Sequence, residues 1–227
     1  MGIHDGHRER LRKRFLTQGL SGFEPVNVLE LLLFFSHKRC DTNEIAHRLL
    51  DRFGSFSGVL DAPYEMLCQV EGVGPISACL IKLVAGCANY YANDKVKIDE
   101  SINSTGLAGK YLVPRFIGSR NEEVYLLLLD DKHKVLRCTK LFEGTVNMVP
   151  ILVRKVVGEV VAVNATAVIL AHNHPGGLAI PSYEDKMATR KLAATLNDLN
   201  VRLIDHIVVA DGDYVSMRDS GMLEGVN

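Results

Sequence analysis

The segment His172-Asn173-His174-Pro175-Gly176-Gly177 most restricts how this 227-residue chain can fold. It follows the stretch 166–171, Thr-Ala-Val-Ile-Leu-Ala, whose β-branched and aliphatic residues are typical of a buried strand. Side chains two positions apart at the end of a strand point the same way, so His172 and His174 are predicted to face one ion while Asn173 points elsewhere. The proline and two glycines then predict a turn.

A second polar pair follows this turn. Pro181-Ser182 begins a predicted helix, and Asp185 lies three positions after Ser182, on the same face of the first turn. Two imidazoles and one carboxylate, with a fourth position left open, form the ligand set of a catalytic zinc site. We therefore predict that His172, His174 and Asp185 bind Zn²⁺.

The same residues have simpler interpretations. Ser182 and Asp185 also stand where a helix N-cap and its partner form a capping box. Two histidines and a carboxylate can bind non-haem Fe(II), but those sites usually show H-x-D/E followed by a distant histidine, and the order here differs. The combination of an apolar strand, H-x-H, a glycine-rich turn and S-x-x-D favours zinc.

The spacing H-x-H-x7-S-x-x-D resembles the metal signature of the JAMM metalloproteases, and the residues around it resemble the bacterial RadC proteins in particular. The resemblance covers nearly the whole chain. It implies a three-layer α/β domain with a mixed sheet, of the JAMM (cytidine-deaminase-like) class. The segments that carry it are 169–177, Pro181-Ser182, Asp205-His206-Ile-Val-Val209, Leu129-Asp130, Phe142-Glu143-Gly144-Thr145 and Val163-Asn164-Ala165.

The resemblance also implies two catalytic residues. In the JAMM family a glutamate at the start of the first core strand is the general base, and here Glu122 and Glu123 stand side by side. Counting back from Leu129-Asp130 favours Glu122; strand neighbours point to opposite faces, so Glu123 is expected to be a solvated charge at the strand edge. Ser182 would donate a hydrogen bond to the developing oxyanion, in competition with helix capping.

The chain is expected to form two domains, 1–93 and 104–227, joined by a polar linker near Asn93 to Ser104. The first is predicted to be all-helical. The second is predicted to be a mixed sheet with helices on both faces. The predicted helices are Val28–Phe35, Asn43–Phe53, Ala62–Val70, Ile76–Ala92 (with Pro75 as a favourable first residue), Ile151–Val163 and Ser182–Leu199; the predicted strands are Glu122–Asp130, Lys134–Phe142, 166–171, Arg202–Ala210 and Tyr214–Met217.

In the first domain, the turn Gly72-Val73-Gly74 between two helices resembles a helix-hairpin-helix element. In that motif backbone N–H groups hold a DNA phosphate, so Gly72 and Gly74 are candidate phosphate contacts. Such a turn is also the shortest way to join two helices, and residues 1–92 carry ten basic and ten acidic side chains. The cluster from Arg8 to Arg14 is expected to be a frayed arm, and DNA binding is expected to be weak at most.

The amino-acid composition indicates in which compartment the protein is expected to work. No apolar run approaches the ~18 residues of a membrane helix, and no secretory leader is visible, so no membrane partner is expected. Five cysteines without C-x-x-C pairing predict reduced thiols in a cytoplasmic protein, as small core residues, with Cys79 and Cys87 in an apolar helix.

The sequence therefore predicts a zinc-dependent hydrolase that cleaves a peptide or isopeptide bond in an unidentified peptide or protein substrate. The alternative is a DNA-associated or repair-linked accessory protein of the RadC type, whose metal site has another activity or none. A scaffold that has lost its ligands is disfavoured, because His172, His174, Asp185 and Ser182 are all present.

Overall fold

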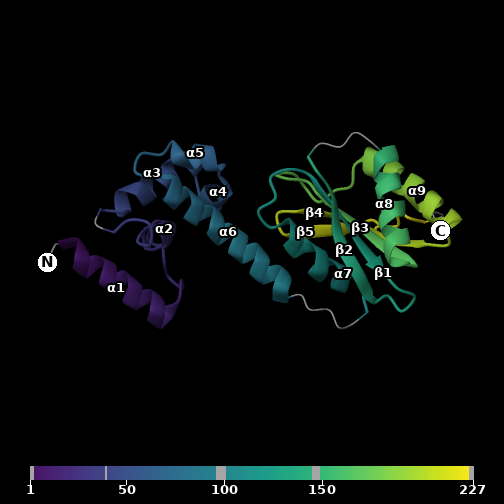
Figure 1. Ribbon diagram of the computed structural model, residues 1–227, viewed down its shortest axis with the longest axis horizontal. Helices are drawn as coiled ribbons and strands as arrows, with labels where there is room; N and C mark the ends of the chain where they lie inside the picture. Colours follow the sequence, from purple (N-terminus) through teal and green to yellow (C-terminus); the bar gives the residue numbers. More distant parts are fainter. Residues whose placement is uncertain (1–2, 39, 96–100, 145–148, 225–227) are drawn as a thin grey trace. The chain divides into compact units, whose positions relative to one another are not determined.

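The computed structural model describes residues 3–38, 40–95, 101–144 and 149–224, and it divides into two compact units, 1–88 and 89–227 (Figure 1). Of the predicted linker, Asn93 to Lys95 still belong to a helix, and residues 96–100 lie outside the described residues. No helix in the described ranges is long and apolar enough to cross a membrane.

The first unit is built of helices around one apolar core. Asn43–Phe53 forms as predicted, and the following long helix begins at Pro75, as expected. The helix α1 and the short helix α4 were not predicted. The helices are α1 (Ile3–Gln18), α2 (Pro25–Leu33), α3 (Asn43–Phe53), α4 (Phe56–Asp61), α5 (Tyr64–Cys68) and α6 (Pro75–Lys95), and their core includes Leu29, Leu33, Ile45, Leu49, Val59, Leu67, Val73 and Ile81.

The basic cluster of α1 is bound to its own unit rather than frayed. The guanidinium of Arg8 donates to the carbonyl of His37 at 2.6 Å and to that of Cys40 at 2.5 Å, and it stacks on the ring of Phe34. Arg14 donates to the carbonyl of Gly22 at 2.5 Å. The expectation of a frayed arm was therefore wrong, because Arg8 and Arg14 are hydrogen-bonded to loop carbonyls of the same unit.

The second unit contains a five-stranded mixed sheet in the order β2-β1-β3-β4-β5. β1 pairs antiparallel with β2 and β3, β3 pairs parallel with β4, and β4 pairs antiparallel with β5. All five strands were predicted. Their bounds are β1 Glu123–Leu129, β2 Val135–Glu143, β3 Ala167–Asn173, β4 Arg202–Ala210 and β5 Asp213–Ser216.

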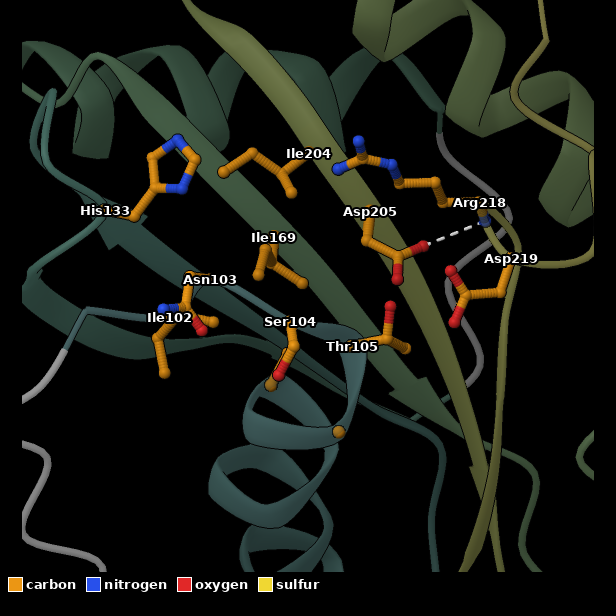
Figure 2. A pocket seen from close by; sticks show the side chains of 12 residues that line it. Ile102, Asn103, Ser104, Thr105, His133, Ile169, Ile204, Asp205, Arg218 and Asp219 are labelled. Carbon is orange, nitrogen blue, oxygen red and sulfur yellow. Dashed lines mark hydrogen bonds between the residues drawn. The ribbon is translucent and has the colours of Figure 1, made fainter.

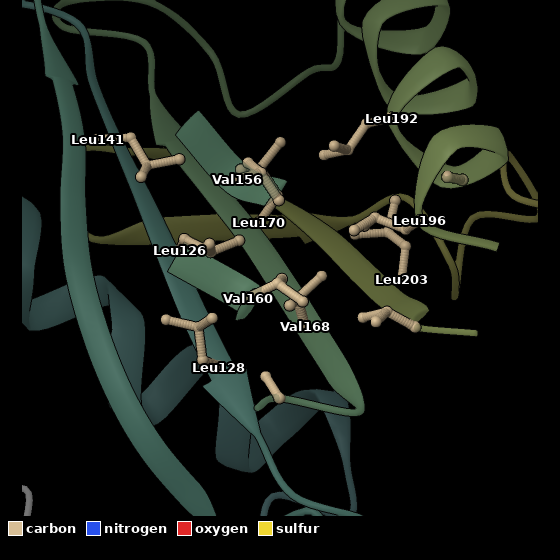
Figure 3. Packing of buried hydrophobic residues seen from close by; sticks show 13 residues of the cluster. Leu126, Leu128, Leu141, Val156, Val160, Val168, Leu170, Leu192, Leu196 and Leu203 are labelled. Atoms are coloured by element: carbon tan, nitrogen blue, oxygen red, sulfur yellow. The ribbon is translucent and has the colours of Figure 1, made fainter. Parts of the chain in front are cut away.

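Helices cover both faces of this sheet, which gives three layers. On one face α8 (Val149–Val163) and α9 (Tyr183–Asp198) pack on alternate residues of the strands (Figure 3). The other face is covered by α7 (Thr105–Leu112) and by a 3₁₀ turn, Val113–Phe116. They pack on the remaining strand residues, whose side chains point to this face. The first core includes Leu126, Leu128, Val156, Val160, Leu170, Leu192, Leu196 and Leu203; the second includes Leu112, Phe116, Leu127, Leu129, Ile169 and Ile207.

Of the five cysteines, which were expected to be core residues, Cys68 packs against the core of the first unit and Cys138 against the second core of the sheet, but the other three do not. Cys40, Cys79 and Cys87 are exposed, whereas Cys68 and Cys138 are half-buried, and all five lie in the described ranges as free thiols. Cys79 and Cys87 are exposed on α6, whose buried residues include Ser77, Ala78 and Ile81. An apolar stretch does not by itself reveal which of its members turn inward.

We expect Gly109→Ala to destabilise the second unit by about 1–3 kcal/mol, because overpacking a filled site costs about that much. Gly109 is buried on α7, and an added Cβ would lie 2.6 Å from Cε1 and 2.8 Å from Cε2 of Tyr214. The ring would have to leave the second core. Denaturant unfolding measures the change in free energy.

The control is Gly106→Ala on the same helix, where an added Cβ would meet no heavy atom within 4 Å. It should be neutral or stabilise the protein by at most about 1 kcal/mol. Equal destabilisation by both variants would contradict the packing role of Gly109.

Candidate metal centre

The histidine pair is positioned by the end of β3. His172 pairs with Val124 of β1 and Val208 of β4, and the backbone N–H of His174 continues the ladder by donating to the carbonyl of Val209 at 2.8 Å. His172 therefore belongs to the face covered by α8 and α9. The pleat brings the two imidazoles together, with 3.0 Å between their Nε2 atoms.

Asn173 points away from the histidines, as predicted, and it fixes the start of β1. Its side-chain oxygen accepts a hydrogen bond from the backbone N–H of Glu123 at 2.6 Å, and its side-chain amide donates to the carbonyl of Asn121 at 3.1 Å. The residue between the two histidines thus anchors the segment that contains Glu122.

The glycine turn determines which nitrogen of His174 is free. Gly176 adopts φ 67°, a left-handed conformation that suits glycine. The turn brings the carbonyl of Leu178 to 3.0 Å from Nδ1 of His174. A carbonyl only accepts hydrogen bonds, so Nδ1 carries the proton and the neutral ring presents the lone pair of Nε2 to the site.

Asp185 enters from the first turn of α9, where the predicted capping box is complete. The hydroxyl of Ser182 accepts a hydrogen bond from the backbone N–H of Asp185 at 3.0 Å. The backbone N–H and the hydroxyl of Ser182 lie 2.8 and 2.7 Å from Oδ2 of Asp185, to which both donate. The box therefore fixes the rotamer of the carboxylate.

The three donor groups converge at distances that fit a divalent metal. Nε2 of His172 lies 3.3 Å from Oδ1 of Asp185, and Nε2 of His174 lies 3.6 Å from Oδ2. In a tetrahedral zinc site with bonds of about 2.0–2.2 Å, neighbouring ligand atoms lie about 3.3–3.5 Å apart. Among the described residues, this is the one group of three or more His, Cys, Asp or Glu side chains close enough to hold an ion.

The carboxylate is charged in this setting. Burial alone would raise the pKa of Asp185, but the contact with the imidazole of His172 and the hydrogen bonds from Ser182 outweigh it and lower the pKa. Asp185 therefore offers an anionic oxygen to a cation, as metal ligation requires.

The adjacent glutamates point to opposite faces of the sheet. Glu122 lines a cavity of about 350 Å³ together with His172 and Asp185. Glu123 is buried on the other side, where its carboxylate accepts hydrogen bonds from Lys140 at 3.1 Å and Ser119 at 2.9 Å. The expectation that Glu123 is a solvated charge was wrong, because Lys140 neutralises it within the fold.

A β-bulge in β4 determines which residue lies behind His172. Val168 pairs with Leu203, but the next residue, Ile169, pairs with Asp205, so Ile204 is an extra residue in β4. The bulge returns His206 to the α8–α9 face beside Leu170, and Nε2 of His206 lies 2.8 Å from Nδ1 of His172.

Asp205 occupies the opposite face. Its carboxylate accepts hydrogen bonds from the hydroxyl of Ser216 at 2.6 Å and the backbone N–H of Arg218 at 3.0 Å. It lines a separate cavity of about 550 Å³, and Figure 2 shows it beside Thr105 and Asp219. Of the neighbours Asp205 and His206, only His206 contacts His172.

Sequence reasoning missed Thr189. Its hydroxyl lies 2.6 Å from Nδ1 of His206 and 2.5 Å from the carbonyl of Asp185. The signal was the spacing: Thr189 is four residues after Asp185 in a predicted helix, so its hydroxyl can reach that carbonyl.

The two glycines predicted to contact phosphate lie in the first unit. An added Cβ at Gly72, which has φ 89°, would lie 2.8 Å from Ile45, and the carbonyl of Gly72 lies 2.9 Å from Nε2 of His37. Packing therefore explains the lack of a side chain at Gly72. At Gly74 an added Cβ would meet nothing within 4 Å, so that side of the turn is open.

Two comparisons with known proteins bear on this chain. Residues 102–222 match the family model described as a RadC-like JAB domain. A curated relative named UPF0758 protein, from Tolumonas auensis, is 35% identical over 215 residues, which is 95% of this chain and 96% of the relative.

We expect about one zinc ion per chain in wild-type protein purified without chelators, and strongly reduced zinc in Asp185→Ala. The variant removes one of three converging donors and keeps the two histidines. Elemental analysis of folded protein measures the zinc content, with Asp205→Ala as the control for loss of a buried aspartate elsewhere. Equal zinc in wild type and Asp185→Ala would contradict the ligand assignment.

Proposed function

Because the chain belongs to the RadC family, with a RadC-like JAB domain over residues 102–222, we propose that it is a zinc-dependent hydrolase of the JAMM type that cleaves a peptide or isopeptide bond. The observation that carries the proposal is that Glu122 lines the same cavity as His172 and Asp185. A carboxylate beside three converging metal donors is the arrangement that metal-assisted hydrolysis requires.

The ligands in this proposal are His172, His174 and Asp185. A zinc ion held there would act as a Lewis acid and lower the pKa of a bound water toward neutrality. Glu122 accepts the proton of the attacking water and later delivers it to the leaving amine. Glu123 is unsuited to this task, because Lys140 and Ser119 already occupy its oxygens.

In this proposal, the hydroxyl of Ser182 serves both in capping α9 and in donating a hydrogen bond during catalysis. Its oxygen caps α9 by accepting from the N–H of Asp185, and its hydrogen points at Oδ2 of the same residue. With a metal bound by Asp185, the hydroxyl hydrogen of Ser182 would be available to a developing oxyanion, while the cap would persist through the oxygen.

The walls of the cavity suit an apolar substrate group. Val124, Phe142, Leu152 and Met187 line it beside the acidic groups. A cavity of about 350 Å³ accommodates one large side chain of a peptide next to the cleaved bond. The substrate class that fits best is a peptide with an aliphatic or aromatic residue at that position.

A DNA-associated role has less support. Arg8 and Arg14 are engaged by loop carbonyls, and Lys82 donates to the carbonyl of Leu60 at 2.8 Å. These hydrogen bonds hold the three cations against their own unit, and residues 1–92 carry as many acidic as basic side chains, which disfavours strong attraction to phosphates.

We expect Glu122→Gln to lower hydrolysis by roughly 10²-fold or more, because the loss of a general base costs about that much. Zinc content and stability should remain near wild type, since Glu122 is not among the converging ligands. Mass spectrometry of a peptide library before and after incubation with the protein measures cleavage. The matched control is Glu123→Gln, which should remain active; an inactive Glu123→Gln with an active Glu122→Gln would overturn the assignment.

We expect DNA binding by the full chain to be weak, with a shallow log–log salt slope of roughly −1 to −3, because about one to three phosphates can be neutralised. Fluorescence anisotropy with duplex and single-stranded DNA at several salt concentrations measures the slope. Gly74→Asp places a carboxylate at the open turn, and Gly86→Asp adds the same charge elsewhere on α6. Sub-micromolar binding at physiological salt that Gly74→Asp alone abolishes would contradict this expectation.

A further inference from the structure

Behind the candidate metal centre, three side chains and one carbonyl form a continuous chain of hydrogen bonds. Nδ1 of His172 contacts Nε2 of His206 at 2.8 Å, and Nδ1 of His206 contacts the hydroxyl of Thr189 at 2.6 Å. The same hydroxyl contacts the carbonyl of Asp185 at 2.5 Å. The chain begins and ends on two of the three proposed ligands, although His206 and Thr189 are not ligands themselves.

The carbonyl of Asp185, at one end of this chain of hydrogen bonds, determines which atom is the donor at each contact. The carbonyl of Asp185 can only accept, so Thr189 donates its single hydroxyl hydrogen there. The contact between Thr189 and His206 then requires that Nδ1 of His206 is the donor. A neutral His206 has an unprotonated Nε2, which accepts from Nδ1–H of His172.

Burial keeps this chain intact. His206 is 3% exposed and Thr189 is 0% exposed, so solvent cannot substitute for a missing partner. Nε2 of His206 faces a donor and Nδ1 faces an acceptor, so both ring nitrogens of a neutral imidazole have the partner that they require.

We propose that His206 and Thr189 are positioning residues of the metal centre: their hydrogen bonds hold His172 as the Nδ1–H tautomer, so that its Nε2 lone pair faces the metal, and they tie the imidazole to the backbone of Asp185. The inference rests on the proposed metal site. Metal-bound histidines usually donate their second N–H to a carboxylate, a carbonyl or water, and partners of this kind typically change metal affinity 10- to 100-fold. Here a buried histidine takes that place.

The bulge at Ile204 explains why the partner is a histidine. If β4 alternated regularly through Ile204, with no bulge, Ile204 would pair with Ile169, and alternation would turn Asp205 toward the α8–α9 face and His206 away from it. Asp205 is instead held on the far face by Ser216 and Arg218. A carboxylate such as that of Asp205 could orient an imidazole, but Asp205 is kept away from the candidate metal centre.

The test compares Thr189→Val, which keeps the shape and lacks the hydroxyl, with Thr189→Ser, which keeps the hydroxyl. In metal-free protein, ¹⁵N chemical shifts of the histidine rings report the tautomer of His172. Wild type and Thr189→Ser should show Nδ1–H, and Thr189→Val should show a mixture of tautomers. Zinc affinity, measured by competition with a chromogenic chelator, should fall 10- to 100-fold in Thr189→Val and stay near wild type in Thr189→Ser.

Thr195→Val is the matched control for the loss of a threonine hydroxyl on α9. It removes a hydrogen bond to the carbonyl of Lys191, four residues earlier, and should leave both readouts unchanged. Unchanged tautomer and affinity in Thr189→Val would overturn the proposal, as would equal losses in Thr189→Val and Thr189→Ser, which would indicate packing alone. An intact zinc site without hydrolysis would refute the proposed function and leave this inference standing, whereas a wild type that binds no zinc would refute both.

Discussion

The parallel pairing of β3 with β4 is the constraint on which the rest of the candidate site depends. It makes β3 a central strand, buried on both sides, and it carries the ladder one residue beyond the strand through the N–H of His174 and the carbonyl of Val209. The two imidazoles are therefore set by backbone hydrogen bonds rather than by a loose loop. A site built on such a ladder needs little reorganisation to receive an ion.

Asp185 joins helix capping to metal binding. The same carboxylate accepts two hydrogen bonds from Ser182 and approaches both imidazoles. Helix capping by Asp185 is thus compatible with a role as metal ligand, because the cap holds its carboxylate in a position to bind an ion. The sequence pattern S-x-x-D is compatible with both interpretations, and the geometry accommodates both at once.

The predictable parts of this fold are those set by local pattern. The strand, the H-x-H pair, the glycine turn and the capped helix follow from neighbouring residues, and so does the helix Asn43–Phe53. The site features that escaped prediction depend on distant partners: Glu123 is buried because Lys140 reaches it from β2. The bulge at Ile204 reverses the orientation expected from simple alternation, and no residue near it in the sequence signals that reversal.

The bulge also has a consequence for the order in which the molecule assembles. His172 is oriented by a residue from β4, which lies after α9 in the chain, so the full centre cannot exist until the strand that follows the last ligand has docked. An ion that prefers the finished centre to the unfolded chain adds its binding free energy to the stability of the sheet. The metal would then stabilise the folded second unit only after β4 has docked. The resistance of this unit to unfolding and proteolysis would therefore rise with the free metal concentration.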